Sequence, residues 1–293
     1  MNCYRLIDAE KANYPVSLLC KVLRVSRSGY YAWRDRSPSR RERENATLIE
    51  QIREIHHRSR GTYGYPRVHA ELRAALGVSC NRKRVARLMR KDGLRGCMRG
   101  RRSKPTTRQD LLAVPAPDLV HRNFVATAPN RLWTADITYL PTDEGFLYLA
   151  FILDVYSRKV VGWSMANYLR SELVAAALEM AIRRRNPSAG LIHHSDRGVQ
   201  YTAISFGKKL EEARIVPSIS RVGSALDNAI SESFVSTLKS EIGVSRYPSR
   251  QAARTSVFEF IELFYNRVRR HSSLGYVSPT EYEQAILEEA AVA

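Results

Sequence analysis

The spacing of apolar residues changes near residue 130, and this change constrains the fold more than any other feature. Three strand-like segments then follow in close succession, over 131–140, 146–153 and 157–165. Their β-branched and aromatic content is typical of strands, and their short connections predict an antiparallel meander. Before residue 130, apolar side chains instead recur every three or four positions, as they do in helices. A chain of 293 residues with both patterns is expected to form about two domains.

Helices and strands alternate after the meander. The predicted order is helix 171–185, strand 191–194, helix 203–213, strand 215–219, and then helices 227–242, 251–265 and 279–291. Together with the meander, this order predicts a five-stranded mixed sheet flanked by helices, of the α+β or mixed α/β class. We expect the core of this domain at 126–245 and a C-terminal helical extension of it at 246–293.

Two small helical units are expected before the sheet. Residues 1–36 form a helix-turn-helix-like segment, in which apolar residues recur at helical spacing over 14–34. Residues 37–44 are polar and charged and are expected to be a linker. The second unit, 45–95, contains three helices separated by glycine-containing loops, and Pro66 opens the middle one. The first third of the chain is therefore expected to be all-α.

The third helix of the second unit, expected over 81–91, has two different faces. Val85, Leu88 and Met89 recur at a spacing that places them on the inner side. The outer side is basic and carries Lys83, Arg87 and Arg90, with Arg84 beside them. A helix that follows a turn and is apolar behind and basic in front is typical of a DNA recognition helix. A solvated basic surface is the alternative.

The positive charge is concentrated in the first third of the chain. Residues 1–110 hold 27 Lys+Arg and 10 Asp+Glu, a net charge of +17, while the whole chain carries +18. Such a block predicts a polyanionic partner, and nucleic acid is the usual one. Anionic lipid is less favoured, because no long, strongly amphipathic helix accompanies the charge. Residues 96–125 are expected to be a basic linker, either a spacer or a strap along DNA.

The sequence shows no sign of export, membrane insertion or a structural zinc site. It has no apolar run of about 18 residues, and its first residues lead into a charged stretch. Its four cysteines lie far apart and form no CxxC pair, which fits a reducing compartment. We therefore expect a cytoplasmic protein.

Three carboxylates occupy positions that suggest chemistry. Asp136 interrupts an apolar strand, Asp196 follows another strand, and Glu232 lies in a helix. Mg²⁺ prefers oxygen ligands, and two such ions about 4 Å apart support in-line displacement at phosphorus. Each acid alone also has an ordinary structural explanation. Two further acids, Asp154 and Asp227, are less favoured candidates.

Other polar residues accompany these acids. Lys239 follows Glu232 by two helical turns and Asn228 shares that face, so both are candidates for contact with the DNA backbone. His193 and His194 could be zinc ligands, but no second His or Cys pair supports that role. We favour packing or supporting roles for the two histidines.

The acids and the words around them match a known pattern. Since 35 residues separate Asp196 from Glu232, the three acids reproduce the D,D(35)E triad. The matching words are WTADITYL (133–140), HSDRGVQY (194–201), DNAISESFVSTLKSE (227–241), YNRVRRHSSLGYVSP (265–279), YGYPRVHAELR (63–73) and RVARLMRKDGLRG (84–96). In these words the chain resembles the orfB-type DDE transposases of two-reading-frame bacterial insertion sequences, whose core is similar to that of retroviral integrases. The resemblance covers nearly the whole chain.

The resemblance implies an RNase H-like catalytic core with strand order 3-2-1-4-5 and with the acids at one edge. It implies that Asp136, Asp196 and Glu232 bind two Mg²⁺ or Mn²⁺ ions and that Lys239 contacts terminal DNA. The implied activity is cleavage and strand transfer of element ends, that is, DNA integration and recombination. The implied partners are terminal repeats, target DNA, further copies in a dimer or higher oligomer, and the upstream-frame protein, all at the bacterial nucleoid.

Two other functions remain open at this point. One is an RNase H-like nuclease that only hydrolyses, which would not need the large basic first third. The other is a DNA-binding repressor with an inactive core, which would not need all three acids. We therefore favour the transposase.

Overall fold

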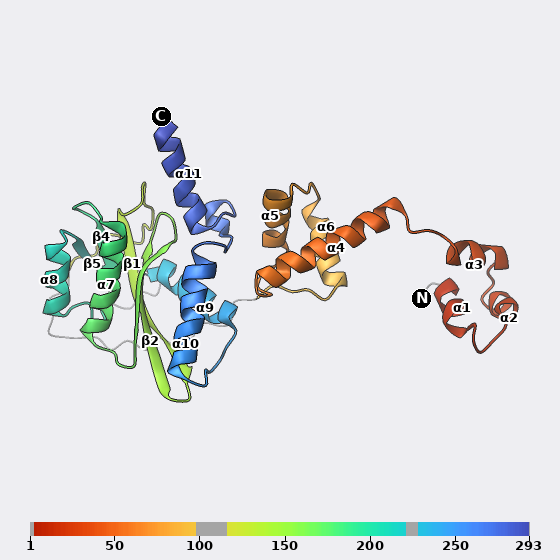
Figure 1. Cartoon of the computed structure of the whole chain (residues 1–293), viewed down its shortest axis with the longest axis horizontal. Coiled ribbons are helices and arrows are strands. Elements are labelled where there is room, and N and C mark those ends of the chain that lie inside the picture. The colour runs from red at the N-terminus through yellow and green to blue at the C-terminus, as the bar shows by residue number, and fades with distance from the viewer. Residues whose placement is uncertain (1–2, 98–115, 221–227, 293) are drawn as a thin grey trace.

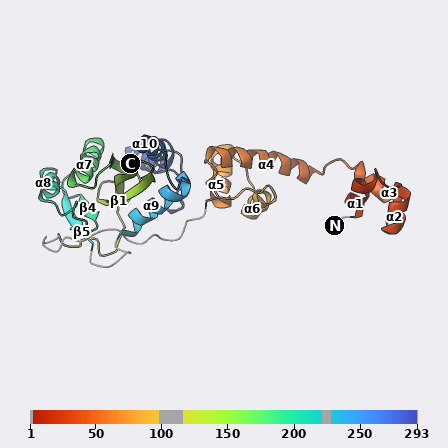
Figure 2. The same ribbon diagram turned by 90° about the horizontal axis from the view of Figure 1, so that it is seen from below.

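The computed structural model describes residues 3–97, 116–220 and 228–292. Its elements form three groups along the chain (Figure 1): a small helical unit at the N-terminal end, a second helical unit, and an α/β body. Figure 2 shows the same succession from below, with the second unit beside the body. Among the described residues, no helix is both long enough and apolar enough to cross a membrane.

The N-terminal unit contains three short helices. They are α1 (Cys3–Glu10), α2 (Val16–Val22) and α3 (Arg27–Arg34). Ser26 caps α3, because its hydroxyl accepts the backbone N–H of Gly29 at 3.0 Å. The three helices share a small core of Ile7, Cys20 and Tyr30. The helices predicted within 14–34 are confirmed, whereas α1, which buries only Ile7, was not predicted as a separate helix.

The second helical unit is longer than predicted. Its helices are α4 (Arg40–Arg58), α5 (Tyr65–Leu76) and α6 (Arg82–Lys91). Thus α4 begins inside the stretch expected to be a linker. A capping box explains this start: the Ser39 hydroxyl accepts the N–H of Glu42 at 3.2 Å, and the Glu42 carboxylate accepts the N–H of Ser39 at 2.8 Å.

The turn between α5 and α6 has the predicted helix-turn-helix chemistry. Gly77 ends α5 with φ 61°, a left-handed conformation that glycine adopts without strain. Asn81 caps the start of α6. Val85, Leu88 and Met89 are buried within the unit, so the apolar face of α6 is the one predicted.

The body contains a five-stranded mixed sheet. Its strands are β1 (Leu132–Thr142), β2 (Gly145–Asp154), β3 (Val160–Ala166), β4 (Ile192–Ser195) and β5 (Val216–Ile219). Their order across the sheet is β3-β2-β1-β4-β5. The first three strands form the antiparallel meander, and β4 runs parallel to both β1 and β5. This is the strand order that the resemblance implies for an RNase H-like core.

The two faces of the sheet bury different helices. One face packs against α7 (Ser171–Arg185) and α8 (Ile204–Glu212), and the alternate residues Trp133 and Ala135 of β1 point to it. Gly162 on β3 permits the close approach of α7, because a Cβ there would collide with the backbone of Ala177. The other face packs against α9 (Ala229–Ile242) and α10 (Arg250–Phe258). Hence α9 lies on one defined face of β1.

The C-terminal extension is part of the body. The predicted helix 251–265 is divided at residue 258: α10 ends there, and Glu259–Tyr265 continues as a π-helix. The wider turn buries four apolar residues, Phe260, Ile261, Phe264 and Tyr265. A short 3₁₀ turn (Ser272–Leu274) and α11 (Pro279–Val292) follow.

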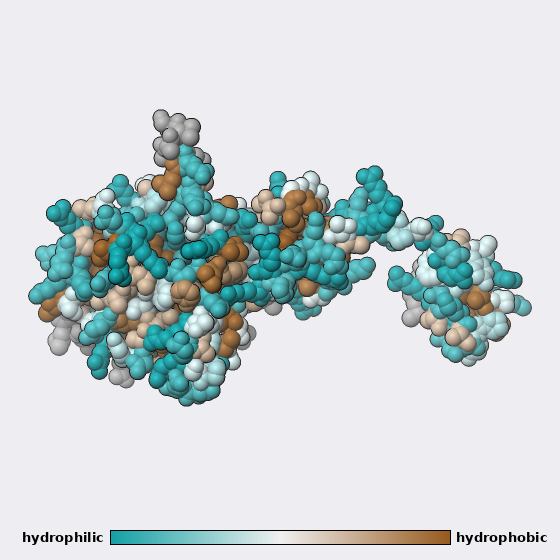
Figure 3. Space-filling view, in the orientation of Figure 1, coloured by the Kyte–Doolittle hydropathy of each residue, from teal (hydrophilic) through white to brown (hydrophobic). Residues whose placement is uncertain are grey.

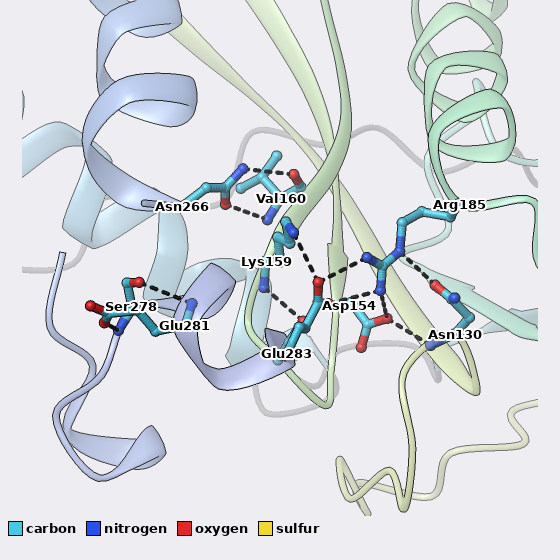
Figure 4. Close-up of polar contacts among 10 residues, drawn as sticks. Asn130, Asp154, Lys159, Val160, Arg185, Asn266, Ser278, Glu281 and Glu283 are labelled. Atoms are coloured by element: carbon cyan, nitrogen blue, oxygen red, sulfur yellow. Dashed lines mark hydrogen bonds and ion pairs between the residues drawn. The ribbon is translucent and has the colours of Figure 1, made fainter. Parts of the chain in front are cut away.

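Polar contacts hold this extension to the sheet (Figure 4). The Asn266 side chain accepts the N–H of Val160 at 2.9 Å and donates to its carbonyl at 3.0 Å. On α11, the Glu283 carboxylate accepts hydrogen bonds from Arg185 at 2.7 Å and from Lys159 at 2.8 Å. The extension is therefore fixed to β3 and α7 by side chains distant in sequence.

The expected linker 96–125 is only partly a linker. The backbone N–H of Leu119 donates to the Ser218 hydroxyl at 3.0 Å, and Val120 is buried beside Leu132. Part of 116–125 therefore packs on the body, which differs from the linker expected over 96–125. Most of the predicted basic strap, 98–115, lies outside the described residues. In the space-filling view (Figure 3), hydrophilic residues cover most of the visible face.

Candidate active site

The topology of the sheet brings Asp136 and Asp196 to the same place. Strands β1 and β4 pair only from Leu132 to Thr134 and then separate. Asp136 lies on β1 just beyond this pairing, and Asp196 directly follows the last residue of β4. Residues at the carboxyl ends of parallel strands meet at one edge of a sheet, where binding sites commonly form. The two acids predicted from sequence are thus neighbours.

The third acid, Glu232, lies in the first turn of α9 and is placed by a buried polar contact. The Thr134 hydroxyl lies 2.6 Å from Asn228 Oδ1 and 2.7 Å from the Ser231 hydroxyl. The Asn228 amide also donates to the carbonyl of Ala135 at 3.2 Å. Thr134 and Ser231 are fully buried. These bonds fix the start of α9 against β1, one residue from Glu232 and beside Asp136.

Asn228 therefore differs from the sequence-based expectation of a DNA contact. It is 8% exposed, and both ends of its amide bond to β1. Its contribution is to position α9.

The electrostatics of Asp136 show that the acids interact. Burial raises the pKa of the Asp136 carboxyl most, and the negative charges of Asp196 and Glu232 raise it further, to about 8. The N–H of Ile137, 2.7 Å from Asp136 Oδ1, opposes this shift. Bound cations would relieve this repulsion at Asp136.

The oxygen donor set fits Mg²⁺ in chemical type. Three carboxylates from β1, the end of β4 and α9 supply hard oxygen ligands of the kind that this ion prefers. Within the described ranges, however, no three His, Cys, Asp or Glu side chains are gathered closely enough to enclose a metal ion. The acids thus form an open group of neighbouring carboxylates.

Lys239 lies on the acidic side of α9. Its ammonium group is 4.8 Å from the centre of the Tyr139 ring. Burial lowers the pKa of Lys239, while the negative charge of Asp136 opposes that shift. The side chain is still exposed, so a cation is available to an anionic ligand beside the acids.

The two histidines pack rather than form a metal site. His193 is buried against the rings of Tyr201 and Phe206, and burial lowers its pKa to about 4. His194 Nδ1 lies 2.9 Å from the Ser218 hydroxyl. Both results agree with the packing role predicted from sequence.

The two less favoured acids are also accounted for. Asp154 is fully buried and accepts the backbone N–H groups of Asn130 at 2.7 Å and Tyr156 at 2.9 Å. It therefore has a structural role at the end of β2. Asp227 lies outside the described residues.

Three residues near the acids were missed in the sequence. Thr134 and Ser231 position α9. The sequence pattern that could have indicated them is a small hydroxyl residue at a position expected to be buried in an apolar strand or helix. Tyr201 lies in the segment HSDRGVQY, where burial raises its pKa and the charges of Asp136 and Asp196 raise it further. Its hydroxyl has no hydrogen-bond partner within the described part of the chain.

The candidate recognition helix α6 presents part of the predicted basic face. Lys83, Arg87 and Arg90 are exposed. Arg84 instead turns back toward α4, donating to Asn45 at 2.9 Å and pairing with Glu44 at 3.4 Å. The expectation that Arg84 contacts DNA is therefore not supported by its position, which serves to attach α6 to α4.

Comparisons with known proteins agree with this architecture. Residues 126–225 and 213–279 match the family described as Integrase core domain, and residues 42–102 match the HTH-like domain. An uncharacterised 31 kDa protein of insertion element IS600 from Shigella sonnei is 43% identical over 274 residues, covering 93% of this chain and 100% of its own.

Transposase InsF for insertion sequence IS3A of Escherichia coli (strain K12) is 40% identical over 283 residues, covering 96% of this chain and 98% of its own. Among solved structures, the HTLV-2 integrase catalytic core domain in complex with magnesium aligns with 54% of this chain and 99% of that chain. Its TM-score is 0.41 and its identity is 16%.

Proposed function

The chain belongs to the family of the InsF transposases of insertion sequences, and on that premise we propose that Asp136, Asp196 and Glu232 are its catalytic acids. The observation that carries the proposal is that the acids come from three separate elements and that, after burial, the charges of Asp196 and Glu232 both raise the pKa of Asp136. A structural role would not require a buried acid, Asp136, to lie within reach of two further negative charges at the opening between β1 and β4. A phosphoryl-transfer role does, because carboxylates that bind cations must be brought together.

We propose that these acids hold two divalent cations, Mg²⁺ or Mn²⁺. When bound, such ions activate the attacking oxygen and stabilise the leaving oxygen of an in-line displacement at phosphorus. The protein itself supplies the arrangement: the sheet fixes Asp136 and Asp196, while Thr134 and Asn228 hold the start of α9.

DNA is the proposed partner at two places. Near the acids, Lys239 binds a phosphate of the terminal DNA, because it is an exposed cation on the same side of α9 as Glu232. On the second helical unit, Lys83, Arg87 and Arg90 of α6 face the major groove of the terminal repeat. We propose further that the chain acts at the nucleoid as a dimer or higher oligomer, together with the upstream-frame protein.

The reaction can be tested with a labelled duplex of the element's own terminal repeat, Mg²⁺ and a target duplex. Asp136→Asn, Asp196→Asn and Glu232→Gln are each expected to slow joining on the order of a thousandfold, since metal-held charge contributes several kcal/mol to the transition state. Binding of the terminal repeat should change little. Asp143→Asn, an equivalent change at an exposed acid beyond β1, is the control and should join normally.

The alternatives give different products in the same assay. A hydrolytic nuclease would shorten the labelled strand without joining it to the target. A repressor with an inactive core would bind the duplex and leave it intact. Near wild-type joining by any one of the three acid variants would remove that residue from the proposed set.

A further inference from the structure

Two segments of the sequence play no part in the proposed chemistry, and the structure brings them together. One is TYGYPRV (62–68), which leads into α5, and the other is YNRVRRHSSLGYVSP (265–279) in the C-terminal extension. The Tyr63 hydroxyl donates to the carbonyl of Val268 at 3.2 Å and accepts the N–H of Arg270 at 2.7 Å. The second helical unit is thus joined to the body through backbone groups about 200 positions away in the chain.

Charged side chains complete this junction at the last turn of α9. Arg269 donates to both oxygens of Glu241 at 2.7 Å, and Arg67 of α5 donates to the same carboxylate at 3.2 Å. The side chains of Glu241 and Arg269 are 6% and 5% exposed. An acid at a helix C-terminus is disfavoured by the helix dipole. Two arginines, one from each side of the junction, offset that cost for Glu241.

Apolar contacts continue from one unit into the other. A single buried cluster includes Leu72 and Met89 of the second helical unit and Phe264 and Tyr265 of the π-helix. Within it, Tyr265 packs edge-to-face on Phe234 of α9, with ring centres 4.9 Å apart. The helix that carries Glu232 and Lys239 is therefore held near its start by Tyr265, and at its end by the bonds of Arg67 and Arg269 to Glu241.

We infer that Arg67, Glu241 and Arg269 are positioning residues that couple the DNA-reading unit to the catalytic helix. The inference rests on the proposed roles of Glu232 and Lys239 on α9. When α6 is docked on the terminal repeat, Arg67 transmits the position of its unit to the last turn of α9, two residues from Lys239. Segments 62–68 and 265–279 thus connect the proposed DNA-binding unit to the helix that carries the proposed catalytic residues. In this proposal neither segment contacts the reacting phosphate.

The test compares Arg67→Ala with Arg58→Ala in the full-length chain. Arg58 is an exposed arginine on α4 of the same unit, so both variants lose one positive charge from that unit. We expect both to bind the terminal-repeat duplex with similar affinity, while Arg67→Ala joins about tenfold more slowly. Glu241→Gln should show the same loss, and Arg67→Lys, which keeps the charge, should recover part of the rate.

Hydrogen exchange supplies a readout that does not depend on activity. Backbone amides of 236–242 should exchange faster in Arg67→Ala than in Arg58→Ala, while those of α7 stay unchanged and show that the fold persists. Unchanged exchange at 236–242, or joining by Arg67→Ala at the rate of Arg58→Ala, would overturn the inference. A failure of the proposed function looks different, because the wild-type chain itself would then give no joined product.

Discussion

At the scale of single residues, a few buried hydroxyl and amide groups determine where the acids lie. Thr134 is the centre of this set, since its one hydroxyl contacts both Asn228 and Ser231 on α9. No water competes for these bonds, because all three side chains are buried. The position of Glu232 is therefore set by buried groups that attach the start of α9 to β1.

Replacing Thr134 by Val keeps the shape of the side chain and removes its hydroxyl. We expect the free energy of unfolding to fall by about 1–3 kcal/mol, because partners on α9 lose a buried hydrogen bond. Joining should slow as well, since α9 is no longer fixed beside Asp136. Thr138→Val, at a buried position on the same face of β1, is the matched control. Equal melting temperatures and equal rates for the two variants would contradict this role.

At the scale of elements, α6 and α11 show two different uses of charge. On α6, three exposed cations lie on the side opposite a buried apolar face. The charged side chains can therefore be replaced without disturbing the contacts that stabilise the helix. On α11, Glu283 is 7% exposed and bonded to Arg185 and Lys159, so its charge serves the fold. We therefore expect loss of charge to weaken DNA binding on α6 and to lower stability on α11.

For α6, replacing Lys83, Arg87 and Arg90 together by Ala should weaken binding of the terminal repeat without lowering the melting temperature. If all three contact phosphates, the slope of log K against log salt should become less negative by about three. Leu88→Ala should do the opposite, lowering stability by roughly 2–5 kcal/mol through a buried cavity. Unchanged affinity in the triple variant at every salt concentration would mean that this face is only solvated.

For α11, Glu283→Gln should lower the free energy of unfolding at pH 7 by about 1–3 kcal/mol. Burial opposes ionisation of Glu283, but the bonds from Arg185 and Lys159 outweigh it and leave its pKa below the ordinary value. The ionised Glu283 carboxylate therefore stabilises the folded chain at pH values above the pKa that Glu283 has in the unfolded chain. This stabilisation is lost as the pH falls through the lower pKa that Glu283 has in the folded chain. The stability difference from wild type should therefore shrink in acid. Glu288→Gln, exposed on the same helix, should behave as wild type at both pH values.

At the scale of the whole molecule, the three groups of elements differ in their dependence on one another. The N-terminal unit has its own core around Ile7 and Tyr30. The second helical unit instead shares one buried cluster with the body, through residues such as Tyr63 and Phe264. Independent folding is thus expected for the first unit and not for the second.

Deletion of residues 1–36 should leave the melting temperature of the remaining chain nearly unchanged. Deletion of 1–97 should lower it clearly and promote association, because Phe264 and its neighbours lose their cover and expose apolar surface. Thermal unfolding and light scattering of the two truncated chains would distinguish these outcomes. If the chain lacking 1–97 melts at the same temperature as the chain lacking 1–36, the shared cluster does not stabilise the body.

The sequence was most informative where local patterns decide the structure. Helix 171–185 follows from apolar spacing, whereas the strand order is what the resemblance implies, and both are confirmed. The start of α4 was missed because one capping box outweighs a polar composition. Arg84 and Asn228 were read as DNA contacts because spacing gives the face of a helix but not its neighbours. The Tyr63–Arg270 contact joins residues 207 positions apart, and no local signal in a single sequence reports such a pairing.

The length of α9 has one more consequence. Glu232 and Lys239 are seven residues apart on one unbroken helix, which separates their backbones by about 10.5 Å. Successive nucleotides of one DNA strand rise by about 3.4 Å, so this separation corresponds to roughly three nucleotides. A straight helix does not shorten or stretch as a loop can. With the roles proposed for Glu232 and Lys239, the distance between the reacting phosphate and the phosphate bound by Lys239 would be fixed by the length of α9. That distance would set how far from its tip a DNA end must be bound to be cut at the correct bond.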